Sequence, residues 1–121
     1  MSDSWTVAAV VIRVVDAGEL ELRLDLGWRI HLDVTARLVG IWLPPVESDK
    51  GMDARRVVCG LLESTGGALD GSGAEVTFVC HELGPKGSVG QVLATTPQGR
   101  SFDLGEELMN AGHGVPADAR T

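Results

Sequence analysis

Basic residues are scarce in this sequence, and their scarcity limits the functions it can have. Only 10 of the 121 residues are Lys or Arg, against 17 Asp or Glu, so the formal net charge is −7 at pH 7. Proteins that bind nucleic acid gain much of their affinity by neutralising phosphates with cationic side chains, and anionic membrane surfaces attract the same residues. The charge balance therefore argues against a general nucleic-acid binder and against a protein that docks on a membrane surface.

Long apolar runs and cysteines are scarce too. The longest apolar runs, at residues 7–12 and 40–46, are far shorter than the roughly 18 residues that a spanning helix needs. The N-terminus has no basic segment followed by an apolar one, so we expect no secretory signal and a cytoplasmic location. Cys59 and Cys80 lack metal-ligand spacing. We expect two buried reduced thiols, with a disulfide as the alternative.

The first forty residues show a period of two. With 44% hydrophobic and 22% charged residues, the chain has the composition of one globular domain over residues 1–121. Apolar and polar residues alternate over 20–26 and again over 28–38, and residues 6–15 are rich in β-branched side chains. The short joints at 16–18 and at Gly27 suit hairpins. These residues predict a three-stranded antiparallel meander.

Beyond Pro44 and Pro45 the period changes to that of a helix. Asp49 or Ser48 can cap its start, and Gly66 marks its end. The spacing places five apolar residues on one helical face. They are Ala54, Val57, Val58, Leu61 and Leu62.

The remaining residues predict two more strands and a second helix. Residues 74–81 alternate, with Val76, Phe78 and Cys80 on one face, and residues 89–96 form the fifth strand. Asp103 with Glu106 fits the start of a helix that ends at Gly112, with Leu104, Leu108 and Ala111 on its apolar face. Five strands with a helix between the third and the fourth predict a mainly β protein with two helices, an OB-fold Greek-key barrel.

Several local sequences resemble the staphylococcal nuclease (thermonuclease-like) family. They follow the family's order over nearly the whole chain, and they are closest in character to short versions encoded by viruses of actinobacteria. The resemblance implies the nuclease-like form of the OB barrel. The matching pieces are Val14-Val15-Asp16, Leu20-Glu21-Leu22, Asp25-Leu26-Gly27-Trp28, Arg37-Leu38-Val39-Gly40-Ile41 with Pro44, Lys50-Gly51-Met52-Asp53-Ala54-Arg55, Gly90 with Leu93-Ala94, and Glu106-Glu107-Leu108 before Ala111-Gly112-His113.

The same resemblance implies that the catalytic groups have been lost. Active relatives hold Ca²⁺ with acidic side chains, activate water with a glutamate and bind the phosphate with two arginines. Here Arg37 keeps the first arginine, Gly18 and Trp42 replace two metal-ligating aspartates, Pro45 replaces the glutamate, and Gln91 replaces the second arginine. We therefore expect a degenerate nuclease without a metal cofactor. A shifted metal site is the alternative, with oxygens from Asp16, Glu19, Glu47 or Asp49.

Three function hypotheses follow. The first is a non-catalytic, nuclease-like OB module that acts through protein–protein contacts or self-assembly, as a virion component or accessory protein of a bacteriophage. Its candidate contact patch is Trp42, Leu43, Pro44 and Pro45, since tryptophan is enriched at interaction hot spots. The second is a weak divalent-metal-dependent nuclease. The third, a nucleic-acid-binding OB module without chemistry, is disfavoured because the chain has five aromatic residues and no basic stripe.

Other polar residues that could suggest a site are expected to lie at the surface. His81 and Glu82 have no second histidine at ligand spacing. His31 alternates onto the polar face of its strand, and His113 follows the last helix, where a cation suits the helix dipole. Arg55 and Arg56 are expected on a solvated helix face.

Overall fold

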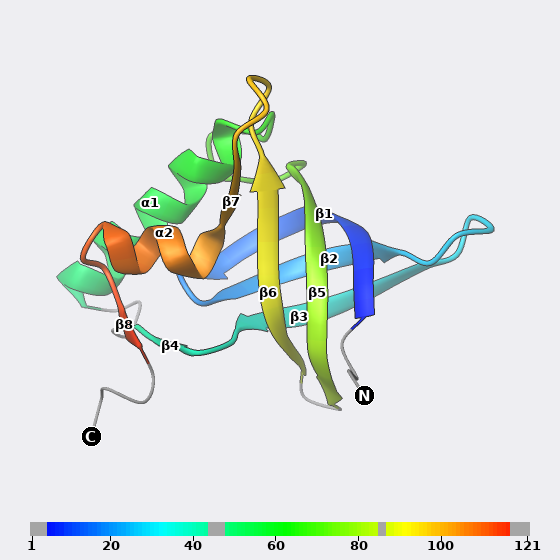
Figure 1. The fold of residues 1–121 in the computed structure, drawn as a ribbon, viewed down its shortest axis with the longest axis horizontal. Coiled ribbons are helices and arrows are strands. Elements are labelled where there is room, and N and C mark those ends of the chain that lie inside the picture. Colours follow the sequence, from blue (N-terminus) through cyan, green and yellow to red (C-terminus); the bar gives the residue numbers. More distant parts are fainter. Residues whose placement is uncertain (1–4, 44–47, 85–86, 117–121) are drawn as a thin grey trace.

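The computed structural model describes residues 5–43, 48–84 and 87–116, which form eight strands and two helices (Figure 1). Their order along the chain is β1 (Trp5–Asp16), β2 (Glu19–Asp25), β3 (His31–Leu38), β4 (Ile41–Trp42), α1 (Asp49–Glu63), β5 (Glu75–Gly84), β6 (Gly87–Thr95), β7 (Ser101–Asp103), α2 (Leu104–Asn110) and β8 (Val115–Pro116).

Five of the strands close into a barrel. The main sheet has the order β3-β2-β1-β5-β6-β7, and its antiparallel neighbours include both hairpins of the predicted meander. A short parallel pairing of β3 with β6, Ala36–Leu38 with Ser88–Gly90, joins the ends of the five-stranded part. The molecule is therefore mainly β with two helices and a closed five-stranded barrel, which confirms the predicted OB-like fold class.

The barrel interior follows the predicted period of two. Leu20, Leu22 and Leu24 point inward from β2, and Val76, Phe78 and Cys80 point inward from β5. Phe78 is the largest fully buried side chain among the described residues. Cys59 and Cys80 are both free and buried, as predicted, and burial raises the pKa of the Cys59 thiol.

Helix α1 packs against the barrel as its apolar spacing predicts. Ser48 is the N-cap, and its hydroxyl accepts a hydrogen bond from the Gly51 amide at 3.0 Å. Ala54, Val58 and Leu62 are fully buried, whereas Val57 and Leu61 are half-buried. The helix ends at Glu63, with Ser64 as C-cap, a little earlier than the predicted Gly66.

Helix α2 is capped by Asp103, as predicted, but it is shorter than predicted. It ends at Asn110, because Gly112 adopts a left-handed φ of 81° and turns the chain. Leu104 and Leu108 are buried, whereas Ala111 is exposed, so the prediction that Ala111 lies on the apolar face is wrong.

The sequence patterns do not predict three short strands of the structure. β7 adds an edge next to β6, and β4 pairs with β8 as a separate two-stranded ribbon. Segments of two or three residues are too short to show a period. Within the described ranges, no helix is long and apolar enough to cross a membrane.

The β2–β3 hairpin extends beyond the barrel (Figure 1). β1 pairs with β2 only as far as Leu24, and β6 pairs with β3 only from Ala36 to Leu38. The alternation at residues 28–38 marks a strand with one polar and one apolar face. The barrel does not cover the apolar face at its outer end, where Trp28, Ile30 and Leu32 face solvent.

Candidate functional site

Arg37, which the resemblance matches to the first arginine, lies on the outer face of β3. It is directly opposite Glu19 on β2, and its Nε lies 3.2 Å from Glu19 Oε1. The Arg37 side chain is 61% exposed. The guanidinium is thus paired with a carboxylate of this chain, at a solvated position where an ion pair stabilises the fold only weakly.

Gly18 stands at the position that the resemblance matches to a metal-ligating aspartate. Its amide donates a hydrogen bond to Asp16 Oδ1 at 2.8 Å. A Cβ placed on Gly18 would lie 2.8 Å from Cδ1 of Leu43. The space that a side chain at position 18 would enter is therefore occupied by an apolar group.

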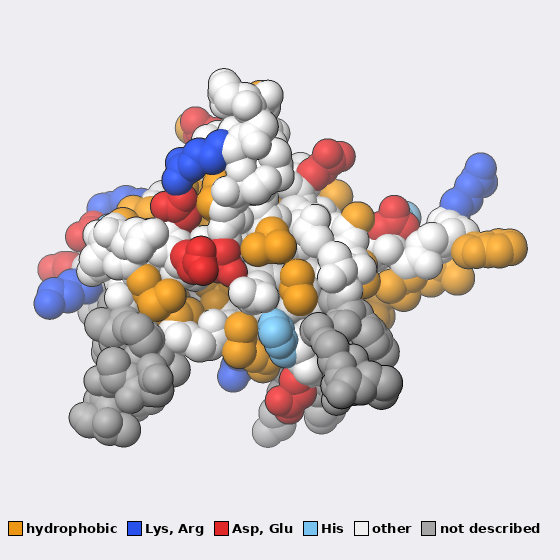
Figure 2. All heavy atoms as spheres, in the orientation of Figure 1, with side chains coloured by type: hydrophobic (Ala, Val, Ile, Leu, Met, Phe, Trp, Pro, Cys, Tyr) orange, Lys and Arg blue, Asp and Glu red, His pale blue; other side chains and the backbone are white. Residues whose placement is uncertain are grey.

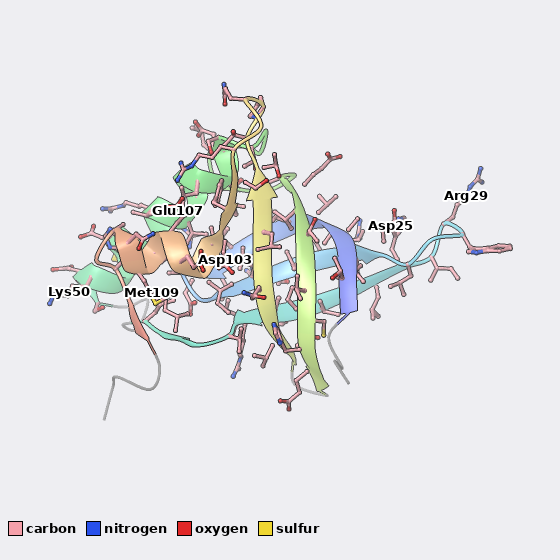
Figure 3. All side chains as sticks on the ribbon, in the orientation of Figure 1. Asp25, Arg29, Lys50, Asp103, Glu107 and Met109 are labelled. Atoms are coloured by element: carbon pink, nitrogen blue, oxygen red, sulfur yellow. The ribbon has the colours of Figure 1, made fainter. Side chains whose placement is uncertain are left out.

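Gln91 stands at the position that the resemblance matches to the second arginine, and its side chain connects three elements. Its Nε2 donates to Asp103 Oδ2 at 2.9 Å, and its Oε1 lies 3.3 Å from Nε2 of His81 on β5. Asp103 in turn accepts hydrogen bonds through Oδ1 from the amides of Gly105 and Glu106 at the start of α2. Figure 3 shows Asp103 where α2 begins beside β6. These contacts make Gln91 a connection between β5, β6 and the cap of α2.

The fold brings Arg37 and Gln91 onto neighbouring strands. Leu38, next to Arg37, is paired with Gly90, next to Gln91. Pro45 lies outside the described residues, and nothing is described of the Trp42 side chain. Of the alternative metal ligands, Asp16 and Glu19 make the contacts given above, Asp49 begins α1, and Glu47 lies outside the described residues. Among the residues that the structure describes, no three His, Cys, Asp or Glu side chains gather closely enough to hold a metal ion.

The predicted contact patch at residues 42–45 is described only at Leu43. Leu43 is half-buried and packs against the hydrophobic core. It also lies against Gly114, where an added Cβ would be 2.9 Å from Leu43 Cδ2. The described part of the patch therefore contributes to packing, and the contact role of Trp42, Pro44 and Pro45 stays a prediction.

A different apolar surface lies on the β2–β3 hairpin, and the sequence patterns missed it. Figure 2 shows hydrophobic side chains along this projecting hairpin, and Figure 3 shows Arg29 at its tip and Asp25 nearer the barrel. The exposed fraction reaches 96% at the tip. We call the following residues the hairpin surface: Leu26 (48% exposed), Trp28 (96%), Ile30 (56%) and Leu32 (42%).

The tip of the hairpin is a tight turn with unusual backbone conformations. Gly27, Trp28 and Arg29 all have positive φ, at 82°, 55° and 63°. The turn is held by Asp25 Oδ1, which accepts from the Gly27 amide at 2.9 Å, and by a 3.0 Å hydrogen bond from the Leu26 amide to the Ile30 carbonyl. A bulky residue such as tryptophan rarely adopts a left-handed φ, which costs on the order of 1 kcal/mol or more. The turn thus holds Trp28 in solvent at a cost in backbone energy.

An ion pair joins the two strands of the hairpin. Arg23 donates from Nε to Asp33 Oδ1 at 2.8 Å and from Nη2 to Oδ2 at 3.1 Å. This hydrogen bonding lowers the pKa of the Asp33 carboxyl and raises the pKa of Arg23. Residues 23–33 contain two arginines and two aspartates, so the hairpin is electrically neutral with neutral histidine, although the whole chain carries −7.

A shallow groove of about 310 Å³ runs along the base of the hairpin. It lies between the hairpin and strands β1 and β5, and Arg23, Asp25, His31 and Glu75 contribute charged or polar groups to it. This volume is at the lower limit of ordinary ligand pockets. The hairpin surface is therefore the more distinctive candidate site.

No protein-family model matches the chain, and no curated protein is significantly similar to it.

Proposed function

We propose that this chain is a non-catalytic OB-fold module that acts through protein–protein contacts made by the hairpin surface. One observation carries the proposal: Leu26, Trp28, Ile30 and Leu32 are exposed together on a hairpin that projects from a closed barrel. Contiguous exposed apolar surface marks interaction sites. Tryptophan and arginine are the side chains most enriched in interaction hot spots, and Trp28 is followed by Arg29 at the tip.

The contacts at the nuclease-like positions support the absence of catalysis in this proposal. Leu43 fills the space in front of Gly18, Arg37 is paired with Glu19, and Gln91 is hydrogen-bonded to Asp103. Each group thus has a partner within the fold. Together with the resemblance to short viral nuclease-like proteins, they favour a degenerate barrel that works as a virion component or accessory protein.

A photo-crosslinker at the hairpin tip tests this function. With p-benzoylphenylalanine in place of Trp28, illumination in the source cells is expected to give protein adducts, because this side chain is 96% exposed on the proposed interface. The matched control carries the same group in place of Leu69, which is 83% exposed in the loop between α1 and β5. Equal labelling at the two positions, or none at position 28, would overturn the proposal.

A nuclease assay tests the rival enzymatic function, which the retained Arg37 favours. Plasmid and single-stranded DNA are incubated with Ca²⁺, Mg²⁺ or Mn²⁺, alongside an Arg37→Ala variant. We expect no cleavage above the metal-free control, because loss of one transition-state-stabilising group commonly costs about 10²–10³ in rate and the resemblance implies that four have been replaced. Metal-dependent cleavage that disappears in Arg37→Ala would establish the nuclease instead.

A further inference from the structure

The outer edge of β3 is unpaired over most of its length. On one side, β2 pairs with β3 from Glu19 opposite Arg37 to Asp25 opposite His31. On the other side, β6 covers only Ala36–Leu38. None of the other strands in the described ranges pairs with residues 31–35 of β3. An unpaired strand edge is a template for another strand, and natural proteins protect such edges with charged side chains (lysine above all), proline or a bulge. Residues 31–35 contain no lysine or proline, and their register with β2 is regular. Their one acidic side chain, Asp33, is already paired with Arg23.

The hydrogen-bonding pattern shows which backbone groups lie on this edge. In an antiparallel pair, residues alternate between those that bond the neighbouring strand and those whose N–H and C=O point away from it. The Leu26 amide bonds the Ile30 carbonyl at 3.0 Å, and the Leu38 amide bonds the Gly18 carbonyl at 2.9 Å. The backbone N–H and C=O groups of the even-numbered residues of β3 therefore point toward β2. Those of the odd-numbered residues His31 and Asp33 point toward the free edge.

We propose that two copies of this chain pair antiparallel through the free edges of β3, about a twofold axis at Leu32. The two hairpins then form one four-stranded antiparallel sheet. This inference rests on the proposed function, since it names the first partner of the hairpin as a second copy. A twofold contact requires a self-complementary surface, and among axes at Leu32, Asp33 and Val34 the first meets this requirement best.

That register is selected by charge and by the existing barrel. With the axis at Leu32, His31 of each copy lies opposite Asp33 of the other, and their outward backbone groups exchange hydrogen bonds. Leu32 then faces Leu32 of the second copy. An axis at Asp33 would oppose two carboxylates, which is destabilising. An axis at Val34 would set His31 of one copy against position 37 of the other, where β6 already covers the edge.

The charge distribution favours contact through the hairpin over contact elsewhere. Two copies with a net charge of −7 each repel one another, but residues 23–33 carry equal numbers of arginines and aspartates. The hairpin also projects from the barrel (Figure 1), so the excess acidic residues stay on the barrels, away from the contact. Apolar side chains also meet across the proposed contact, because Ile30 of one copy lies opposite Val34 of the other in this register.

The test combines sedimentation equilibrium with residue-resolved amide exchange on the full chain. We expect a concentration-dependent dimer in which exchange at His31 and Asp33 slows as dimer forms, while the amides bonded to β2 are slow at every concentration. Leu32→Lys is expected to weaken the dimer at least about tenfold, because two ammonium groups would face each other at the axis. Leu69→Lys is the matched control, at an exposed leucine in the loop between α1 and β5, and is expected to leave the dissociation constant unchanged.

Three outcomes would overturn the inference. They are a wild-type chain that stays monomeric at every concentration, a dimer whose His31 and Asp33 amides exchange freely, and a Leu32→Lys variant that associates as well as Leu69→Lys. The exchange measurement uses the unaltered chain, so it decides even if Leu32→Lys misfolds. A monomer that still crosslinks to other proteins through position 28 would refute the dimer and leave the proposed function standing.

Discussion

Replacing Gly90 with alanine is expected to cost more than about 3 kcal/mol of stability, or to prevent folding, because the substitution overpacks the barrel wall. A Cβ at this position would lie 2.1 Å from the carbonyl oxygen of Val79 and 2.9 Å from Cε1 of Phe78. The oxygen belongs to the backbone of β5, so it cannot rotate away as a flexible side chain would. The Phe78 ring is fully buried, so it cannot move into solvent to make room.

Gly90 also lies where the barrel closes. It pairs with Cys80 on β5 and with Leu38 on β3, and its carbonyl accepts a hydrogen bond from the Val39 amide at 2.9 Å. Moving β6 outward to accommodate a methyl group would therefore weaken its pairing with β5 and its pairing with β3 at once. The loss is expected to be cooperative rather than confined to one strand.

Gly60→Ala is the matched control for this substitution. Gly60 lies in α1, and a Cβ there meets nothing within 4 Å. Because alanine has the higher helix propensity, this change is expected to stabilise the protein by about 0.5–1 kcal/mol. Urea denaturation of both variants measures the contrast. A Gly90→Ala variant as stable as the wild type would contradict the close approach of β5 and β6.

The predictable part of the fold is the part where one face of an element is buried throughout. Alternation over β2 and β5 predicts the inward residues correctly, because a sheet buries every second side chain. The spacing on α1 predicts Ala54, Val58 and Leu62 for the same reason, with a helical period. In these segments local pattern and tertiary packing agree.

The β2–β3 hairpin itself is predicted, but the exposure of its outer end is not, because alternation does not reveal how far a neighbouring element extends. Ile30 and Leu32 continue the apolar positions of Ala36 and Leu38, yet the barrel covers only the latter two. Whether an apolar residue is buried depends on β1 and β6, which are distant in the sequence. One local signal was available: Gly27 beside Trp28 and Arg29 marks a turn, and a residue at a hairpin turn is seldom buried.

At the candidate site, too, the sequence shows which residues are present but not what they contact. The resemblance singles out positions 18, 37 and 91, and the residues there are read directly from the sequence. Their contacts cannot be read from the sequence, because only the closed barrel brings Leu43 to Gly18 and Gln91 to Asp103. The free edge of β3 is equally invisible in the sequence, since it exists because β6 ends its pairing at Ala36.

Leu62→Ala is expected to destabilise the protein by about 2–5 kcal/mol, because a fully buried leucine leaves a cavity that the surroundings cannot fill. Leu62 joins α1 to the loop before β5: a Cβ placed on Gly71 would lie 3.1 Å from its Cδ1, and its carbonyl accepts hydrogen bonds from Thr65 and Gly67. The loop is also tied to β1, since the Gly73 amide bonds the Val11 carbonyl at 2.7 Å. These backbone bonds prevent the loop from collapsing into the cavity, which places the expected loss in the upper half of the range.

The control is Leu69→Ala in the same loop. Leu69 is 83% exposed, so the same truncation is expected to change stability by less than about 0.5 kcal/mol. Urea denaturation at equilibrium measures the free energy of unfolding of both variants. If Leu62→Ala cost no more than Leu69→Ala, helix α1 would not be a structural part of the barrel core.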